Sequence, residues 1–205
     1  MLDALRGLLP RHCPGCGRPL AHHAGLCPAC QRGLHFTVVS HTPLRPDVTP
    51  HLICLGEYRG TLRRAIREMK YGGAREVAGV FGRALGRGVP DRWQLERVVP
   101  VPLHPRREQV RAFNQAEAVA HALADEAGLP LGRLLRRVKD TSAQAKLHAD
   151  ARTYNLDGAF ATCGSVSPRV LLVDDVLTTG ETLRACTTAL LQGGAERVYY
   201  AVIAR

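Results

Sequence analysis

The chain has 205 residues, enough for one medium-sized domain and a small appendage. Hydrophobic residues make up 45% of it, as in ordinary globular proteins, and no apolar run approaches the length of a membrane span. The apolar stretch at the N-terminus is too short for a signal peptide, so we expect no membrane insertion and no secretion and predict a cytoplasmic location.

The net charge is +10, from 28 Lys and Arg against 18 Asp and Glu, and Arg supplies most of the positive charge. Such a balance suits a nucleic acid or a polyanionic small molecule as a partner. An Arg-rich composition also arises from genomic base composition alone, so charge by itself does not select a function.

Four of the seven cysteines form two close pairs near the N-terminus, Cys13 with Cys16 and Cys27 with Cys30. In a chain without a secretory signal, this spacing indicates a Zn²⁺ site before it indicates disulfides. The surrounding segment, residues 8–39, has almost no periodic apolar pattern and needs a staple to fold. We predict a small zinc module with four cysteine ligands. Two disulfides or free thiols are the alternative, and His12, His22 and His23 are substitute candidate ligands.

Residues 40–50 hold three prolines and little apolar pattern, which is typical of a linker of limited flexibility. We therefore expect the zinc module and linker to occupy residues 1–45. A second domain is expected over residues 46–205.

Strand and helix patterns alternate along the second domain. In chain order they predict a strand over 51–57, a helix around 62–70, a helix over 76–85, a short strand over 97–102 and a helix over 114–127. Residues 131–160 are mostly charged and predict a long arm with a short helix. A strand over 170–173, a helix over 180–192 and a strand over 197–204 complete the chain. This alternation favours an α/β fold whose mainly parallel sheet is flanked by helices.

The most specific pattern follows the strand at 170–173, where two acids and an apolar pair lead into a Thr-Thr-Gly turn. Backbone N–H groups and hydroxyls at a helix N-terminus favour a phosphate, and nearby carboxylates suit sugar hydroxyls or Mg²⁺. Asp174 and Asp175 are the candidate catalytic acids. The candidate phosphate-binding run is Val176, Leu177, Thr178, Thr179, Gly180, Glu181 and Thr182. An ordinary strand-to-helix turn with polar caps is the alternative.

This pattern resembles the loop that binds 5-phosphoribosyl-1-pyrophosphate (PRPP) in type I phosphoribosyltransferases. The resemblance implies that fold and a Mg²⁺ ion bound together with PRPP. A carboxylate facing the phosphate would repel it, so we expect Glu181 to point to solvent near the helix N-terminus.

A basic loop after the strand at 97–102 holds three guanidinium groups in six residues, those of Arg106, Arg107 and Arg111. Such a loop can clamp a pyrophosphate bidentately, and a solvated charged loop is the alternative. Lys70 is a candidate for the same anionic site, with equal weight given to a helix-end cation favoured by the dipole.

Basic and polar residues of the charged arm lie where related enzymes carry a mobile lid: Lys139, Gln144, Lys146 and Arg152. A basic lid would exclude water from a ribosyl cation and neutralise the departing pyrophosphate. The same residues are candidates for DNA contact, and a solvated surface segment is the alternative.

Several short motifs together resemble the ComF family, phosphoribosyltransferase-like proteins with an N-terminal zinc finger. After the four cysteines they are Tyr58-Arg59-Gly60, Lys70-Tyr71-Gly72, Pro100-Val101-Pro102, Arg111-Ala112-Phe113-Asn114-Gln115, Gln144 with Leu147, Arg152 with Asn155, and Asp174 to Gly180. Ala112 stands where the family has a glycine. If that position needs a positive φ, alanine strains the loop by about 1 kcal/mol.

The resemblance implies a PRPP-binding protein of natural transformation that handles incoming single-stranded DNA beside a helicase partner. Two other functions stay open. One is an active phosphoribosyltransferase for an unidentified nitrogenous acceptor, although no segment predicts a base pocket. The other is a ligand-sensing scaffold whose zinc module binds a protein partner. Aromatic residues make up only 5% of the chain, which gives little support to extensive base stacking.

Overall fold

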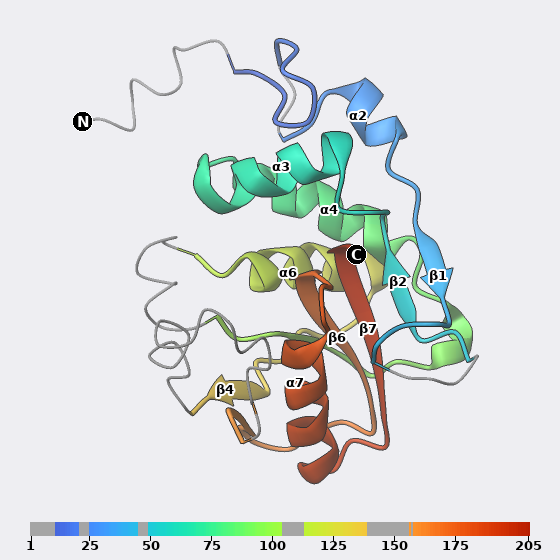
Figure 1. Cartoon of the computed structure of the whole chain (residues 1–205). Coiled ribbons are helices and arrows are strands. Elements are labelled where there is room, and N and C mark those ends of the chain that lie inside the picture. The colour runs from blue at the N-terminus through green and yellow to red at the C-terminus, as the bar shows by residue number, and fades with distance from the viewer. Residues whose placement is uncertain (1–10, 21–24, 45–48, 104–112, 139–155, 157) are drawn as a thin grey trace.

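The structure is a computed structural model, and it describes residues 11–20, 25–44, 49–103, 113–138, 156 and 158–205 (Figure 1). A five-stranded sheet in the order β1-β2-β7-β6-β3 forms the centre. Its strands are β1 (Thr37–Val39), β2 (Leu52–Cys54), β3 (Arg97–Pro100), β6 (Arg169–Val176) and β7 (Arg197–Ala204). Neighbouring strands are parallel except β1, which pairs antiparallel with β2. The predicted α/β fold with a mainly parallel sheet is confirmed.

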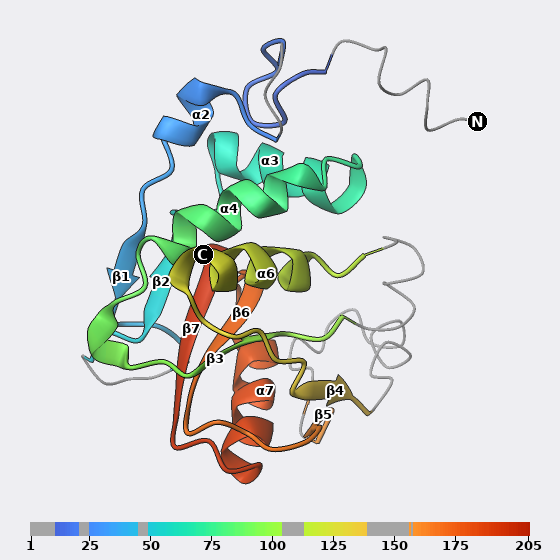
Figure 2. The same cartoon turned by 180° about the vertical axis from the view of Figure 1, so that it is seen from behind.

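Helices cover both faces of the sheet (Figures 1 and 2). The helices α3 (Gly60–Tyr71), α4 (Glu76–Gly86) and α6 (Gln115–Ala127) pack on one face, and α7 (Glu181–Gln192) packs on the other. The interior strand β6 therefore turns Leu171 and Val173 toward the first group and Val170 and Leu172 toward α7. A strand buried on both faces is continuously apolar, which explains why this segment was predictable.

The predicted helices form for the expected local reasons. The buried side chains of α3, Leu62, Ala65, Ile66 and Met69, follow the spacing of one helix face. At the start of α6 the Asn114 side chain accepts a hydrogen bond from the Glu117 N–H, and the helix ends at Gly128 with φ +65°. A Cβ on Gly82 of α4 would collide with the Val119 carbonyl oxygen of α6, so a glycine is needed where these two helices touch.

Two short strands lie where only an arm was predicted. β4 (Leu135–Arg137) pairs antiparallel with β5 (Phe160–Thr162), and this small sheet packs against α7. Strands of three residues leave too little alternation to be recognised in a charged segment. The short helix predicted in this arm is not found at residues 131–138, 156 or 158–160, and the rest of the arm lies outside the described residues. β1 precedes the boundary predicted at residue 45, which stays a prediction.

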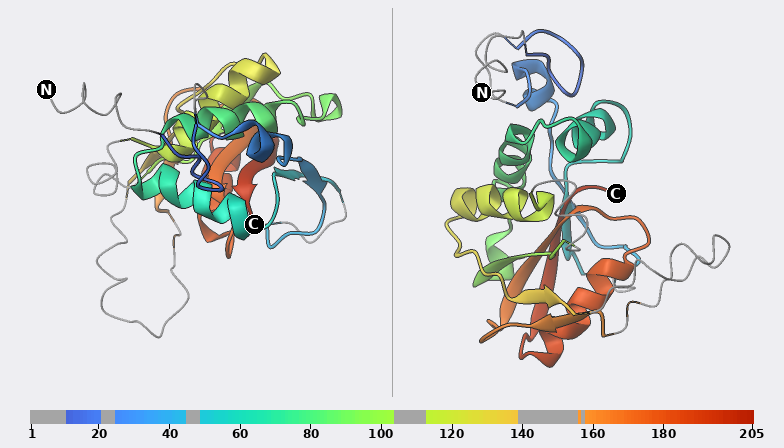
Figure 3. Two further views of the ribbon diagram at one scale, coloured as in Figure 1. Left: turned by 90° about the horizontal axis from the view of Figure 1, so that it is seen from above. Right: turned by 90° about the vertical axis from the view of Figure 1, so that its left-hand side faces the viewer.

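The N-terminal cysteine segment lies over α3 and α4, at the end of the molecule away from α7 (Figure 3). It contains the short helix α2 (Pro28–Arg32), and a 3-10 turn, η1 (Asp91–Trp93), precedes β3. Leu26, Cys13 and Cys27 are buried in the same cluster as the inner faces of α3 and α4. The segment is therefore packed onto the core of the sheet domain. No helix in the described part of the chain combines the length and apolarity needed to cross a membrane.

Candidate functional site

The site lies at the carboxyl end of β6, where a parallel sheet commonly places its ligand. The Leu177 N–H donates to Ala204 O at 2.9 Å, so the chain stays attached to β7 just beyond the strand. Leu177 is buried, whereas Thr178 and Thr179 are exposed. Gly180, with φ +80°, is the N-cap of α7. The first turn of α7 then presents Glu181 and Thr182, both partly exposed.

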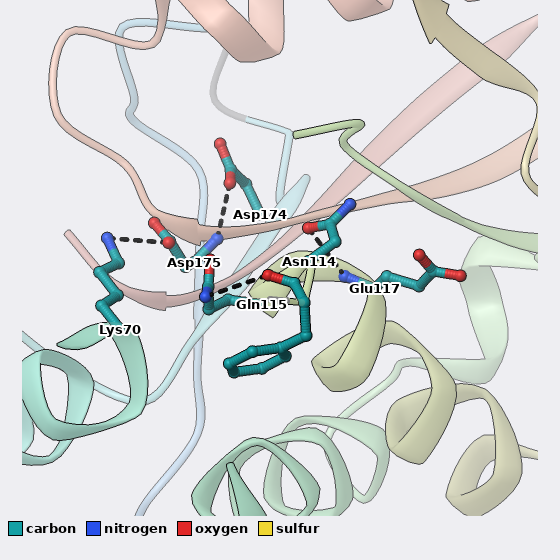
Figure 4. A network of polar contacts seen from close by, with 7 residues as sticks. Lys70, Asn114, Gln115, Glu117, Asp174 and Asp175 are labelled. Atoms are coloured by element: carbon teal, nitrogen blue, oxygen red, sulfur yellow. Dashed lines mark hydrogen bonds and ion pairs between the residues drawn. The ribbon is translucent and has the colours of Figure 1, made fainter. Parts of the chain in front are cut away.

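A lysine from a distant helix joins the two acids. Lys70 Nζ, at the end of α3, lies 2.8 Å from Asp175 Oδ2, and the two side chains are only 15% and 17% exposed. Figure 4 shows this ion pair beside Asp174, whose Oδ1 accepts a hydrogen bond from the Asp175 N–H at 2.8 Å. The fold thus brings Lys70 to the same strand end as the acids, which are 104 and 105 positions away in the sequence.

Burial controls the protonation of the first acid. Loss of solvation raises the pKa of Asp174 to about 7, and the negative charge of Asp175 acts in the same direction. The Asp175 N–H and the charge of Lys70 oppose this shift. Asp174 therefore gains and loses its proton close to neutral pH, where an ordinary aspartate is fully ionised.

The beginning of α6 supplies residues that the site prediction omitted. Asn114 Nδ2 donates to Val101 O at 3.1 Å, which fixes the helix start to the segment after β3. Gln115 is 1% exposed and donates to Phe113 O (Figure 4). The Arg75 guanidinium lies 4.9 Å from the centre of the Phe113 ring. The Phe-Asn-Gln motif was the available signal, and its polar members donate hydrogen bonds to the backbone carbonyls of Val101 and Phe113.

Several predicted site residues lie outside the described residues, so their positions stay predictions. In the basic loop these are Arg106, Arg107 and Arg111, and in the arm they are Lys139, Gln144, Lys146 and Arg152.

The four N-terminal cysteines form one cluster, with all their Sγ atoms within 4.8 Å of one another. Cys16 Sγ and Cys27 Sγ are 3.6 Å apart, close to the ~3.8 Å that a tetrahedral site with Zn–S bonds of about 2.3 Å requires. None of the four is in a disulfide, and the exposed His12 is not in the cluster. The geometry fits a structural Zn²⁺ held by four thiolates.

Backbone amides prepare this cluster for a cation. Burial raises the pKa of Cys13, but backbone N–H groups outweigh it and lower the pKa to about 6. One of them is the Cys27 N–H, which donates to Cys13 Sγ at 3.3 Å. Burial and the neighbouring thiols raise the pKa of Cys30. Four sulfurs this close cannot all ionise without a cation, and Zn²⁺ supplies that charge.

Comparison with known families agrees with both parts of the structure. Residues 114–205 match the model of the phosphoribosyl transferase domain, and residues 4–42 match that of the double zinc ribbon domain. The chain is thus a phosphoribosyltransferase-like protein with an N-terminal zinc ribbon. The solved structure of the allosteric regulatory enzyme of purine biosynthesis resembles 67% of this chain and is itself covered to 30%, with 18% identity and a TM-score of 0.44.

Relatives along nearly the whole chain define the family more closely. DNA utilization protein YhgH of Salmonella typhimurium is 30% identical, over 91% of this chain and 80% of its own. Competence protein F of Haemophilus influenzae is 29% identical, over 95% and 84%. Competence protein ComFC of Bacillus subtilis is 27% identical, over 89% and 72%. The chain belongs to the ComF family.

Proposed function

We propose that the protein binds PRPP together with Mg²⁺ at the carboxyl end of β6. We further propose that it acts in natural transformation, handling incoming single-stranded DNA in the cytoplasm beside a helicase partner. The observation that carries the first part is the arrangement around β6. Two partly buried carboxylates and one lysine meet there beside an exposed Thr-Thr-Gly turn at a helix N-terminus.

Each group of the site has a task that its chemistry suits. N–H groups and hydroxyls from Thr178 to Thr182 hold the 5-phosphate, because a helix N-terminus favours an anion. Asp174 and Asp175 accept hydrogen bonds from the ribose hydroxyls. Lys70, 2.8 Å from Asp175, adds positive charge on the side of the pyrophosphate. The fit to Mg²⁺ rests on the carboxylate oxygens, and the ion would neutralise pyrophosphate charge.

The role in transformation is supported by the printed names of the relatives, competence proteins and DNA utilization proteins. The net charge of +10 suits a polyanionic partner. Together these observations favour DNA over an uncharged macromolecule as the partner.

A groove of about 930 Å³ between the cysteine segment and α3 is a described surface that suits a nucleic acid strand. Arg11, Arg64 and Arg67 line it together with Glu68 and Glu76. Tyr71, one helical turn beyond Arg67, is 69% exposed. Guanidinium groups attract phosphates, and an exposed aromatic ring at the end of the same helix offers a surface for base stacking. We assign this groove to the single strand.

Calorimetry tests PRPP binding. Titration of the wild type with PRPP and Mg²⁺ is expected to give a saturable heat that disappears when the metal is omitted. The double variant Asp174→Ala with Asp175→Ala is expected to give none. The exposed pair Asp91→Ala with Asp125→Ala removes the same charge elsewhere and serves as the control. Equal heats in the site variant and the wild type would refute the proposal.

DNA binding is tested with a single-stranded oligonucleotide over a range of salt concentrations. Affinity is expected to fall steeply with salt, and Arg67→Ala is expected to weaken it and reduce the log–log slope by about 1. Arg197→Ala, an exposed arginine at the start of β7, is the matched control. The same slope in the wild type, Arg67→Ala and Arg197→Ala would show that DNA does not bind in the groove. Repeating the titration with PRPP present shows whether the two ligands couple.

The pKa of Asp174 gives specific support to the alternative, an active phosphoribosyltransferase for a nitrogenous acceptor unrelated to DNA. A carboxyl that titrates near neutral pH can take a proton from an attacking nitrogen. This alternative predicts pyrophosphate release when the right acceptor is present. An acceptor panel with a coupled pyrophosphate assay checks it, with the Asp174→Asn variant as the negative control.

A further inference from the structure

Residues Thr42–Leu44, which we call the strap, lie against the proposed phosphate turn although they are distant from it in sequence. A Cβ on Gly180 would lie 2.9 Å from Leu44 Cδ2, so the Leu44 side chain covers the turn at its glycine. Leu44 also packs against the core cluster that contains Leu177. The turn is thus supported by apolar contact from a segment 136 positions earlier in the sequence.

An arginine joins the strap to the turn. Arg184, in the first turn of α7, donates through Nη1 to Thr179 O at 3.0 Å and to Pro43 O at 3.1 Å. Its own N–H donates to Gly180 O at 2.8 Å. One side chain therefore connects two backbone carbonyls, one in the turn and one in the strap.

The strap is itself held by a buried histidine, His51. Thr42 Oγ1 and His51 Nε2 are hydrogen-bonded at 2.8 Å, and the Leu44 N–H donates to Thr42 Oγ1 at 3.1 Å. His51 is fully buried, and its Nδ1 lies 2.7 Å from Thr49 O. These hydrogen bonds hold the strap in place, so a contact with the strap also restrains the turn.

We infer that Arg184 is a positioning residue that orients the phosphate turn of this chain. The Thr179 carbonyl and the Gly180 N–H belong to one planar peptide and point in opposite directions. Holding the carbonyl on Arg184 therefore fixes the direction of the Gly180 N–H, one of the donors proposed to hold the 5-phosphate. The inference rests on the proposed function for its ligand, a phosphate monoester, while the contact between strap and turn exists without the ligand.

Two measurements on the full-length protein test it. Amide hydrogen exchange of residues 177–182 without ligand reports the order of the turn, and calorimetry reports affinity for PRPP with Mg²⁺. Arg184→Ala and Leu44→Ala are each expected to speed exchange in the turn and weaken affinity roughly five- to tenfold, as expected for loss of one such contact. The double variant is expected to lose less than the product of the single losses, because both residues act on one turn. Arg197→Ala is the charge-matched control and is expected to change neither.

The outcomes separate positioning from direct charge attraction. Leu44 carries no charge, so a Leu44→Ala variant with wild-type affinity and wild-type exchange would overturn the inference. Weaker affinity in Arg184→Ala with unchanged exchange would also overturn it, because Arg184 would then act on the ligand itself. Failure of the wild type to bind PRPP refutes the proposed function, and the exchange arm alone then decides whether Arg184 orients the turn.

Discussion

The cysteine cluster and the aspartate pair are both concentrations of acidic groups, and they differ in how the charge is neutralised. Four sulfurs within 4.8 Å suit Zn²⁺, which is held in structural sites by a closed set of four thiolate ligands. Two carboxylates at the end of β6 have one lysine, and the first of them has its pKa raised to about 7. The first centre is complete once zinc is bound. The second has two carboxylates and one lysine, so a bound cation can still balance the remaining negative charge.

Helix α3 connects the two centres. Arg64, in its middle, donates from Nε to Gly15 O of the first cysteine knuckle at 2.7 Å. Lys70, near its end, pairs with Asp175. Because one rigid helix holds both contacts, the predictions below ask how far each centre is independent of the other.

Loss of the zinc site is expected to have the largest effect. Cys30→Ser removes one of the four ligands, so residues 11–20 and 25–33 should lose their order and Leu26 should leave the core cluster over α3. The free energy of unfolding should fall by several kcal/mol, because metal binding energy becomes folding energy in such modules. Zinc content by mass spectrometry and Tm with and without a chelator check this, with Cys163→Ser as the control. An unchanged Tm after chelation would show that the cluster is not a structural zinc site.

Asp174→Asn is expected to stabilise the ligand-free protein above pH 7 and to abolish PRPP binding. The folded chain keeps a proton on Asp174 between its ordinary pKa of 3.8 and about 7, whereas the unfolded chain releases it. Stability of the wild type therefore falls as pH rises through this window and levels off above it. The variant lacks this loss and should gain up to about 4 kcal/mol at pH 8.

Urea unfolding of this variant from pH 4 to pH 8 gives the comparison. The difference from the wild type should grow with pH, and Asp125→Asn should follow the wild type throughout. A difference that stays constant over the whole range would mean that Asp174 has an ordinary pKa.

Lys70→Met is expected to have the next largest effect. It leaves Asp175 without its cation in a partly buried place, which should destabilise the protein by about 2 kcal/mol at pH 8. Because the charge of Lys70 lowers the pKa of Asp174, that pKa should also rise further. Unfolding curves and an NMR titration measure the two effects, with Arg63→Met on the exposed side of α3 as the control. Adding Asp175→Asn should restore most of the stability, and a double variant no more stable than Lys70→Met would argue against the ion pair.

The same comparison explains what the sequence could reveal. Val170 to Val173 lie in a strand buried on both faces, so a local apolar run followed by acids, threonines and glycine was enough to place the strand, the turn and α7. The four cysteines were equally local, because a metal site of this kind has its ligands in two short pairs. Both predictions depended on neighbours within about 20 residues, the range in which spacing carries geometry.

Contacts across the fold were beyond such reasoning. The sequence supports Lys70 equally well as a site residue and as a helix-end cation. Only the packing of α3 in the folded chain brings it to Asp175. Arg184 was not singled out, because its partners are backbone carbonyls, one of them 141 positions away. β1 and β4 are strands of three residues, formed by pairing with a neighbour and not by their own alternation.

The smallest expected effect tests the link between the two centres. Arg64→Ala removes the hydrogen bond to Gly15 O and should lower the free energy of unfolding by about 1 kcal/mol. If α3 transmits strain from the cysteine segment to the acids, this variant should also speed amide exchange near Lys70 and shift the titration of Asp174, 110 positions away in sequence. Arg63→Ala, on the exposed side of the same helix, should do neither. An Arg64 variant that loses stability but keeps the Asp174 titration would show that the zinc module and the acid pair share a core without sharing a function.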